Sequence, residues 1–356
     1  MPYRSSPRSN PHPAFLLLLM VITTAIVSPA LAGPAAGPPV EPVRMAAEAF
    51  GQAMEIEVRG LPQDQARTAI EAAMEEILEI EALSRVNGDA EQGIARLNGA
   101  ARGQAVSLDR RILALLSRAR DFCIWSRGAH GPLGGRLYRL WGLHDDSGVA
   151  ARGLPRGSAL SEAVASAQCN RLALDPTAGT ATLAAGSSVD LWGFAQGYAV
   201  DRALAVLSDH GCDNAWVEVG WVRRGIGDGP GGYGWRLTLP VVEGYTQPLD
   251  EVWIRDRAIA LTRADEEPLI IGGDLYPPFI DQNSGQPAEG VQAVIASSEL
   301  AVDAQGLATA MMILGNRRGQ ALLGGLRPLP SVLWMLGDGT GSPLLAAYQW
   351  SKLKTR

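Results

Sequence analysis

The order of apolar and polar residues predicts both strands and amphipathic helices in this chain. Residues 54–59 alternate apolar with charged side chains, which is typical of a half-buried strand. Residues 65–86 and 109–125 carry apolar side chains at helical spacing instead. The predicted inward residues are Ile70, Met74, Ile77, Leu78 and Leu83 in the first helix and Ile112, Leu115, Leu116, Ala119 and Phe122 in the second. The first helix is expected to have a solvated outer face made by Glu71, Glu75, Glu76 and Glu79.

The second half of the chain contains short apolar runs bounded by glycine or proline. Such runs are strand candidates, and they lie at residues 189–191, 216–219, 235–239, 258–262 and 291–296. Two glycine-rich segments, 128–154 and 225–234, are predicted to be loops. A last helix is predicted over 305–314, with Gly315 as the residue that ends it. This order of elements predicts an α+β fold, in which helices flank a mixed α/β sheet domain.

The N-terminus has the pattern of a secretory signal peptide. Arg4 and Arg8 precede an apolar run over 14–27, and the Ala-Leu-Ala of residues 30–32 supplies the small side chains that a cleavage site needs. A membrane anchor is the alternative interpretation. The run is shorter than the roughly 20 residues of a bilayer span, and Pro29 closes it, so cleavage is favoured.

The N-terminal pattern also sets the expected domain limits and compartment. We expect residues 1–32 to be a signal peptide, residues 33–43 a linker rich in Pro, Gly and Ala, and residues 44–350 a single domain. The mature protein is expected in the periplasm, with no stable membrane span after cleavage. A lipoprotein cysteine is not expected, since the first cysteine of the chain is Cys123.

Charge and cysteine content narrow the classes of partner and site. The net charge is −6 and the chain has no basic stripe, which argues against a nucleic-acid partner. The three cysteines, Cys123, Cys169 and Cys212, lack CxxC spacing and therefore indicate no zinc site. One disulfide and buried free thiols both remain open interpretations.

The segment 189–202 is the most informative part of the chain. It predicts the end of a buried strand, a glycine-containing turn and a helix that begins at about Ala195. The first turn of a helix has free backbone N–H groups, so this corner could bind an anion. Asp190 could accept hydrogen bonds from a ligand, but local sequence favours a helix cap. The neighbouring aromatic residues, which could stack on a flavin or adenine but are more often core, are Trp192, Phe194 and Tyr198.

Seven segments lie in the same order along the chain as the motifs of one known family. The central one is DLWGFAQGYAVD at residues 190–201. It is similar to the pattern D-L-S-x-I-A-K-G-Y-x-V-D of the ApbE family, the FAD:protein FMN transferases. The others cover nearly the whole chain after residue 43 and lie at residues 84–98, 128–142, 217–220, 235–236, 280–287 and 304–315. Each motif is weak alone, whereas seven in order are specific.

The resemblance implies an ApbE-type fold that binds FAD and Mg²⁺, moves FMN onto a threonine of an acceptor protein and releases AMP. By residue-by-residue correspondence, it implies flavin contacts from Asp190, Gln196, Ala129, His130 and Gly131. It places the metal at the Gly193 carbonyl, Gln305 and Thr309, and it assigns a catalytic role on the acceptor side to Asp281. Phosphoryl transfer of this kind depends mainly on positioning and charge neutralisation.

Several polar positions depart from the family pattern. Gln305 stands where the family has a metal-binding Asp, so the site is expected to bind Mg²⁺ weakly. Asp303 could substitute only if its helix begins late. The remaining departures are Gln196 for Lys, Trp221 for the second Gly of G-G, Gly131 for Asp, Pro278 for His, and Thr262-Arg263-Ala264 for T-S-G.

These departures leave two functions open from different classes. The leading hypothesis is an FMN transferase with an adapted metal site. The alternative is a periplasmic flavin-binding or interaction protein of the same fold without transferase activity. A third hypothesis is an oxidoreductase that uses bound flavin, but no specific sequence feature favours it.

Overall fold

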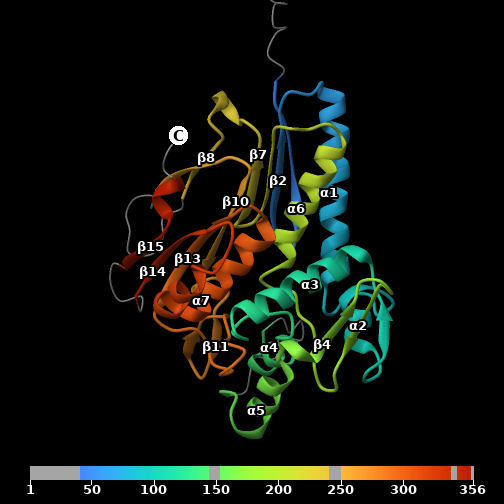
Figure 1. Ribbon diagram of the computed structural model, residues 1–356, viewed down its shortest axis with the longest axis vertical. Coiled ribbons are helices and arrows are strands. Elements are labelled where there is room, and N and C mark those ends of the chain that lie inside the picture. Colours follow the sequence, from blue (N-terminus) through green and yellow to red (C-terminus); the bar gives the residue numbers. More distant parts are fainter. Residues whose placement is uncertain (1–40, 144–152, 240–249, 338–342, 354–356) are drawn as a thin grey trace, which may run out of the picture. The chain divides into compact units, whose positions relative to one another are not determined.

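An antiparallel sheet of eight strands runs through the protein (Figure 1). The computed structural model describes residues 41–143, 153–239, 250–337 and 343–353. The strands are ordered β1-β2-β6-β7-β10-β13-β14-β15, and every neighbouring pair is antiparallel. Their bounds are β1 Val43–Ala49, β2 Gln52–Val58, β6 Ala215–Val219, β7 Val222–Ile226, β10 Arg257–Arg263, β13 Val291–Ser298, β14 Ser331–Leu336 and β15 Leu344–Tyr348.

Both faces of this sheet are covered, which explains the almost continuous apolar run of β13. Successive side chains of a strand point to opposite faces. Val294 and Ala296 accordingly belong to the larger hydrophobic core. Ala293 and Ile295 belong to a second core that includes residues of β8 (Trp235–Thr238), β9 (Glu251–Ile254) and a short 3₁₀ segment, Trp350–Leu353.

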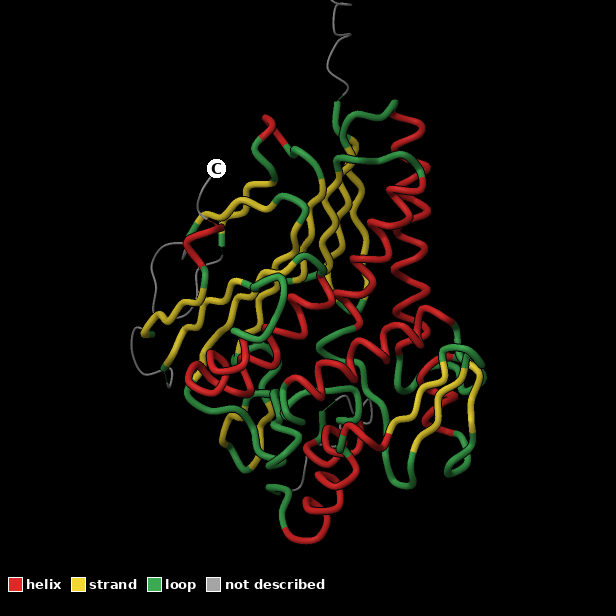
Figure 2. Tube along the Cα trace, viewed as in Figure 1, coloured by secondary structure: helices red, strands yellow, loops and turns green. Residues whose placement is uncertain are grey.

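Helices α1, α6 and α7 pack along one face of the large sheet (Figure 2). Helix α6 lies against α1 and α7, so it holds the centre of this layer. The helix bounds are α1 Gln63–Ser84, α2 Gly93–Gly99, α3 Arg110–Trp125, α4 Gly135–Trp141, α5 Gly157–Ser166, α6 Ala195–Asp209 and α7 Ala301–Leu323. None of the described helices is long and apolar enough to cross a membrane.

Among the described residues, three small antiparallel sheets accompany the large one, and one of them is the pair β8–β9. Strands β3 (Ala105–Ser107), β5 (Thr180–Leu183) and β4 (Leu172–Asp175) form an antiparallel sheet of three. Strands β11 (Leu269–Ile271) and β12 (Asp274–Tyr276) form a hairpin. A third apolar cluster, with Trp141 and Ile280 at its centre, joins α4 and α5 to this hairpin.

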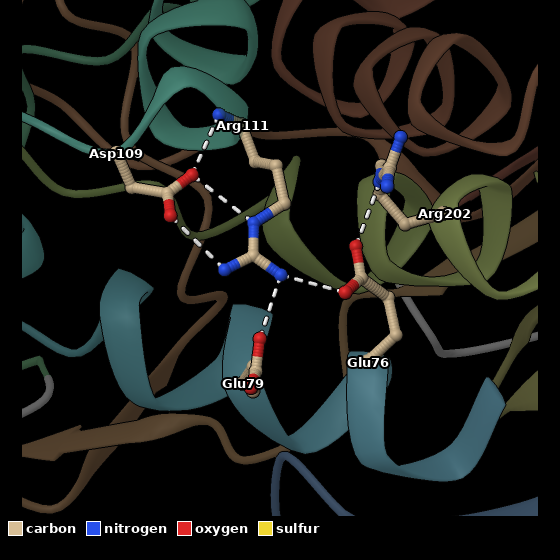
Figure 3. Close-up of polar contacts among 5 residues, drawn as sticks. All are labelled: Glu76, Glu79, Asp109, Arg111 and Arg202. Carbon is tan, nitrogen blue, oxygen red and sulfur yellow. Dashed lines mark hydrogen bonds and ion pairs between the residues drawn. The ribbon is translucent and has the colours of Figure 1, made fainter. Parts of the chain in front are cut away.

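A cluster of five charged residues ties α1, α3 and α6 together (Figure 3). The Arg111 guanidinium contacts Glu76 at 2.6 Å, Glu79 at 2.7 Å and Asp109 at 3.0 Å. Glu76 also accepts a hydrogen bond from Arg202 of α6 at 2.7 Å. The side chain of Glu76 is only 11% exposed, so its predicted place on a solvated face is wrong. Its charge is compensated by two arginines from helices that are distant in sequence.

The structure confirms most of the predicted elements. The strands predicted over 54–59, 216–219, 235–239, 258–262 and 291–296 correspond to β2, β6, β8, β10 and β13, and the two long helices to α1 and α3. The inward residues of α3 are buried. In α1, Leu78 is 46% exposed, so its predicted inward position is wrong. The signal peptide over 1–32 lies outside the described residues.

Three predictions differ from the observed backbone. Residues 189–191 form no strand, because the Asn98 side chain bonds the N–H and carbonyl of Val189, and the N–H of Asp190 donates to the Pro132 carbonyl. Within the predicted loop 128–154, α4 forms a short helix. The last helix begins four residues earlier than predicted. Gly315 breaks it at a φ of 67°, as predicted, but helical structure resumes up to Leu323.

Candidate active site

The N-terminal ends of α6 and α7 meet at a cavity of about 350 Å³. Strands β7 and β10 supply its back wall, and residues before and after the β11–β12 hairpin line another side. Four predicted site residues line it together: Gly193 and Gln196 from the start of α6, and Gln305 and Thr309 from α7. These pairs are more than 100 positions apart in the chain, and the packing of α6 against α7 brings them together.

Both ends of the Gln305 amide form a hydrogen bond with α6. Its Oε1 accepts a hydrogen bond from the Gly197 N–H at 2.8 Å. Its Nε2 donates to Oε1 of Gln196 at 2.9 Å. Gln305 therefore satisfies one of the free N–H groups of the first turn of α6 and fixes the Gln196 side chain. The Ala195 N–H of the same turn donates to the Leu191 carbonyl at 3.0 Å, so at least two donors of the predicted anion-binding corner already have protein acceptors.

Close packing explains the two glycines at the start of α6. Gly193 has a φ of +86°, which favours glycine, and a Cβ there would lie 3.0 Å from the His130 ring and 3.2 Å from Thr309 Oγ1. At Gly197 a Cβ would lie 2.4 Å from the Ala301 carbonyl oxygen. Glycine at both positions lets α6 approach the first turns of α7, which the cavity requires.

Asp190 closes the turn that precedes α6. Its Oδ1 accepts a hydrogen bond from the Trp192 N–H at 2.9 Å. The N-cap residue of α6 is Phe194, without a side-chain cap, so the expectation that Asp190 caps this helix is wrong. Trp192 lines the cavity and packs against Phe279, with ring centroids 5.0 Å apart. Asp190 therefore positions the aromatic wall of the cavity.

Asp281 lies in a turn beside the cavity. Its Oδ1 accepts the Asn283 N–H at 2.9 Å, and its Oδ2 is 3.2 Å from the Arg318 guanidinium. Its side chain is 11% exposed. The preceding residues Pro278 and Phe279 line the cavity. Asp281 thus fixes the conformation of a segment that contributes directly to the cavity wall.

The segment 129–131 lies behind the cavity and not among the residues that line it. Ala129 and His130 are fully buried, and Gly131 packs so closely on Cys123 that a Cβ would lie 2.4 Å from the Cys123 Cβ. Cys123 forms a disulfide with Cys169. Cys212 is a free, buried cysteine. From the sequence, one disulfide and buried free thiols were both possible interpretations. The structure contains one disulfide and one free thiol.

The ring of His130 occupies an apolar position. It stacks on Phe194 with centroids 4.5 Å apart, and neither ring nitrogen has a hydrogen-bond partner among the described residues. Burial lowers the pKa of His130 to about 3. The neutral imidazole is therefore the form present around pH 7, and two buried polar atoms remain uncompensated.

Replacing His130 by phenylalanine is expected to stabilise the protein by about 1–3 kcal/mol, because it removes unpaired buried nitrogens and keeps the stack on Phe194. The gain should grow as the pH falls. Below the unfolded-state pKa of about 6.5, wild type loses stability, since only its unfolded state takes up the proton. Urea unfolding at pH 7 and pH 5 tests this. A smaller gain at pH 5 than at pH 7 would contradict the assignment, and His210→Phe, at an exposed histidine, is the control.

Two acidic residues that no sequence motif indicated also line the cavity. Glu266 and Glu267 follow β10, at a turn where Glu267 has a positive φ of 50°. Burial raises the pKa of the Glu266 carboxyl. Trp221, which replaces the second glycine of the family's G-G pair, lies in the cavity wall, with the Arg223 guanidinium 5.2 Å from its ring centroid. A pair of acids in a loop carries no periodic signal, so only the fold places them here.

Comparison with known proteins agrees with this architecture. The model of the ApbE family matches residues 50–333. The chain belongs to the ApbE family. A FAD:protein FMN transferase of Treponema pallidum (strain Nichols) is 30% identical over 285 residues, which are 74% of this chain and 76% of that protein. One from Rhodobacter capsulatus is 27% identical over 276 residues, which are 75% of this chain and 50% of that protein.

Solved structures of ApbE proteins share the fold. The ApbE protein of Thermotoga maritima superposes with a TM-score of 0.78 at 24% identity, covering 89% of this chain and 100% of that one. The flavin transferase ApbE of Vibrio cholerae gives 0.74 at 22% identity, with the same coverage. At these identities the likeness establishes the ApbE fold, a large antiparallel sheet with flanking helices.

The donors at the expected ApbE metal position do not fit a Mg²⁺ site. Mg²⁺ is usually bound through one or two carboxylates, and the three residues here offer a carbonyl, an amide and a hydroxyl. The Gln305 oxygen already accepts the Gly197 N–H. An aspartate would add roughly 4 kcal/mol of attraction to a nearby cation at an effective dielectric of about 20. The described residues contain no group of three or more His, Cys, Asp or Glu that could hold a metal ion.

Asp303 does not replace the missing carboxylate. It lies in the first turn of α7, which begins at Ala301. Its two oxygens form a bidentate ion pair with Arg118 of α3, at 2.6 and 2.5 Å. The pair commits Asp303 to a contact between α3 and α7, and Asp303 is not among the cavity residues. The alternative that required a late helix start is therefore wrong.

Proposed function

We propose that this chain is an FAD:protein FMN transferase that moves FMN from FAD onto a threonine of an acceptor protein. Membership of the ApbE family and the similarity to transferases from two bacteria support the proposal. The observation that carries it is the cavity itself, where the best-preserved family segment, residues 190–201, meets α7. Its volume of about 350 Å³ lies in the range of small-molecule sites.

The chemistry breaks one bond and forms one. The threonine hydroxyl oxygen of the acceptor attacks the phosphorus of the FMN half of FAD, and the phosphoanhydride bond to AMP breaks. The hydroxyl proton is released and AMP leaves. Positioning supplies most of the acceleration in reactions of this kind. We assign that work to the cavity residues, with Trp192 and Phe279 as the aromatic wall and Gln196 and Thr309 as hydrogen-bonding groups.

The remaining predicted residues have supporting parts in this proposal. Asp190 and the segment 129–131 hold the start of α6 and the turn before it, close to the flavin. Asp281 organises the acceptor side through the turn that follows Phe279. The donors at the expected metal position, the Gly193 carbonyl, Gln305 and Thr309, do not fit Mg²⁺, so we derive no step through it.

We also propose that the protein works in the periplasm after removal of residues 1–32. The Cys123–Cys169 disulfide supports this, because disulfides persist in oxidising compartments and are rare in the bacterial cytosol. Measuring the mass of the protein exported by a bacterial host tests the proposal, since a cleaved signal peptide shortens the chain at Ala32. Retention of the full chain in the cytosol would contradict it.

The function is tested by mixing the protein with FAD, Mg²⁺ and a threonine-containing protein acceptor. Transfer predicts AMP in solution and flavin that stays on the acceptor after denaturation. Noncovalent flavin without AMP would favour the flavin-binding alternative. If neither flavin binding nor AMP is found, the proposal is wrong.

The Gln305→Asp variant is expected to bind Mg²⁺ more tightly and to release AMP faster, because it restores a carboxylate at the metal position. Half of the attraction estimated above already corresponds to more than about tenfold in affinity. The unfolding temperature, measured at increasing Mg²⁺ concentrations, reports the binding. AMP release measures the activity. The matched control is Gln320→Asp, at an exposed position of the same helix. No change in either measurement would mean that the metal position is wrongly aligned.

A further inference from the structure

The hydrogen bonds of Gln305 determine the orientation of two side-chain amides. A backbone N–H can only donate, so the atom of Gln305 that faces the Gly197 N–H at 2.8 Å must be its oxygen. Its NH₂ group then faces Gln196 at 2.9 Å, and the group of Gln196 that receives it must be the carbonyl. The Gln196 NH₂ is therefore the end left over, and it is a donor without acceptor capacity.

This donor belongs to the cavity. Gln196 lines it, half-buried, and its Nε2 has no hydrogen-bond partner among the described residues. Thr309, one helical turn after Gln305, adds a hydroxyl to the same wall. The start of α6, with the positive end of its dipole, lies at the same place. Together these groups place hydrogen-bond donors at the expected metal position. In the family pattern, an aspartate with its Mg²⁺ would attract the phosphate oxygens there.

A neutral pair of amides can take the place of a carboxylate and its cation at this position. A carboxylate with Mg²⁺ carries a net charge of +1, which attracts a pyrophosphate. The Gln305–Gln196 pair is neutral, yet it directs N–H groups at the same ligand without any cation. Hydrogen bonds from neutral donors to a charged acceptor are stronger than those between two neutral groups. Glu266 and Glu267 also line the cavity, and their carboxylates would repel a phosphate.

We infer that this site binds the pyrophosphate of FAD independently of divalent metal, through Gln196 oriented by Gln305. The inference rests on the proposed function, which supplies FAD as the ligand. Gln305 is a positioning residue in it, since it acts through Gln196. Gln196 is the specificity-determining contact. Its NH₂ group favours a ligand group with anionic oxygen acceptors over a ligand group that can only donate hydrogen bonds.

The test is a titration of the full chain with FAD, monitored by flavin fluorescence and carried out once in excess EDTA and once in excess Mg²⁺. We expect the two dissociation constants to agree within about threefold, which is less than 1 kcal/mol. FAD binding that requires Mg²⁺ would overturn the inference. If AMP is also released in the presence of Mg²⁺, the proposed function would still stand. Absence of FAD binding in both conditions would overturn both.

The orientation is tested by Gln305→Glu, which keeps an oxygen toward Gly197 but has no donor for Gln196. The Gln196 amide should then turn its NH₂ toward the new carboxylate and its carbonyl toward the cavity. We expect FAD binding in EDTA to weaken by about tenfold or more, with partial recovery in Mg²⁺. Gln196→Ala should weaken binding to a similar extent in both conditions, and the control Gln320→Glu, at an exposed residue of α7, should not. If Gln305→Glu and Gln196→Ala both bind FAD as wild type does, the inference that Gln305 orients Gln196 toward the pyrophosphate is wrong.

Discussion

Replacing Asp201 by alanine is expected to lower the free energy of unfolding by about 3–5 kcal/mol, which is the cost of breaking a buried ion pair from one side. Asp201 lies in the middle of α6. Its Oδ1 accepts hydrogen bonds from Arg224 of β7 at 2.6 Å and from the Ala301 N–H at 2.9 Å, and its Oδ2 accepts from the Val302 N–H at 3.0 Å. One carboxylate therefore joins a helix, a strand and the first turn of a second helix.

The size of the effect follows from what remains in the variant. Arg224 keeps its charge with a side chain that is only 19% exposed, and α7 loses the acceptor of two N–H groups at its start. Because α7 carries Gln305 and Thr309, the loss should also loosen the cavity and weaken FAD binding. Urea unfolding measures the stability, and a flavin titration measures the binding.

The matched control for Asp201→Ala is Asp209→Ala, at the exposed end of the same helix. It is expected to change stability by less than about 0.5 kcal/mol. Asp201→Asn keeps a carbonyl acceptor but loses the charge, and it should fall between wild type and alanine. A loss below about 1 kcal/mol in Asp201→Ala would mean that the carboxylate does not join the two helices as the structure has it.

Reduction of the Cys123–Cys169 disulfide is the second large expected effect, a loss of about 2–4 kcal/mol. The bond closes a loop with a sequence separation of 46 residues, and such a loop restricts the unfolded chain considerably. Cys123 also packs on Gly131, next to the buried segment that holds His130 beside Gly193. Reduced protein should therefore bind FAD less tightly as well as unfold more readily.

Urea unfolding of wild type with and without a thiol reductant measures this effect, together with a double variant that replaces both cysteines by alanine. The reduced protein and the double variant should agree within about 1 kcal/mol. Cys212→Ala is the control, because Cys212 is buried but forms no disulfide. Its stability should respond to the reductant as wild type does. A wild-type unfolding midpoint that does not move on reduction would contradict a disulfide in the purified protein.

Residues 189–202 show how much of the structure can be predicted from local sequence. The start of α6 at Ala195 was predicted correctly, since a turn and a helical pattern are written in adjacent residues. The strand before it was not, because Asn98, from a helix almost a hundred positions earlier, takes up the backbone bonds of Val189. The helix α4 was missed for a similar reason: it is short and glycine-bounded, and its burial against Ile280 and α5 stabilises it.

The site was predicted in part. Family motifs led to Gly193, Gln196, Gln305 and Thr309, which do line one cavity. Glu76 was placed on a solvated face, because helical periodicity alone cannot reveal that Arg111 and Arg202 lie opposite it. Glu266 and Glu267 lie in an irregular turn, where no spacing rule applies.

The class of fold, the family and the residues at the start of α6 could be predicted from the sequence alone, because periodicity and motifs are properties of neighbouring positions. The contacts of those residues could not. Asp303 pairs with Arg118, Asp201 accepts hydrogen bonds from the start of α7, and the Gln305 amide bonds to Gly197 and Gln196. Each of these bonds joins positions about 100 or more apart, and a hydrogen bond forms only where folding brings donor and acceptor within about 3 Å.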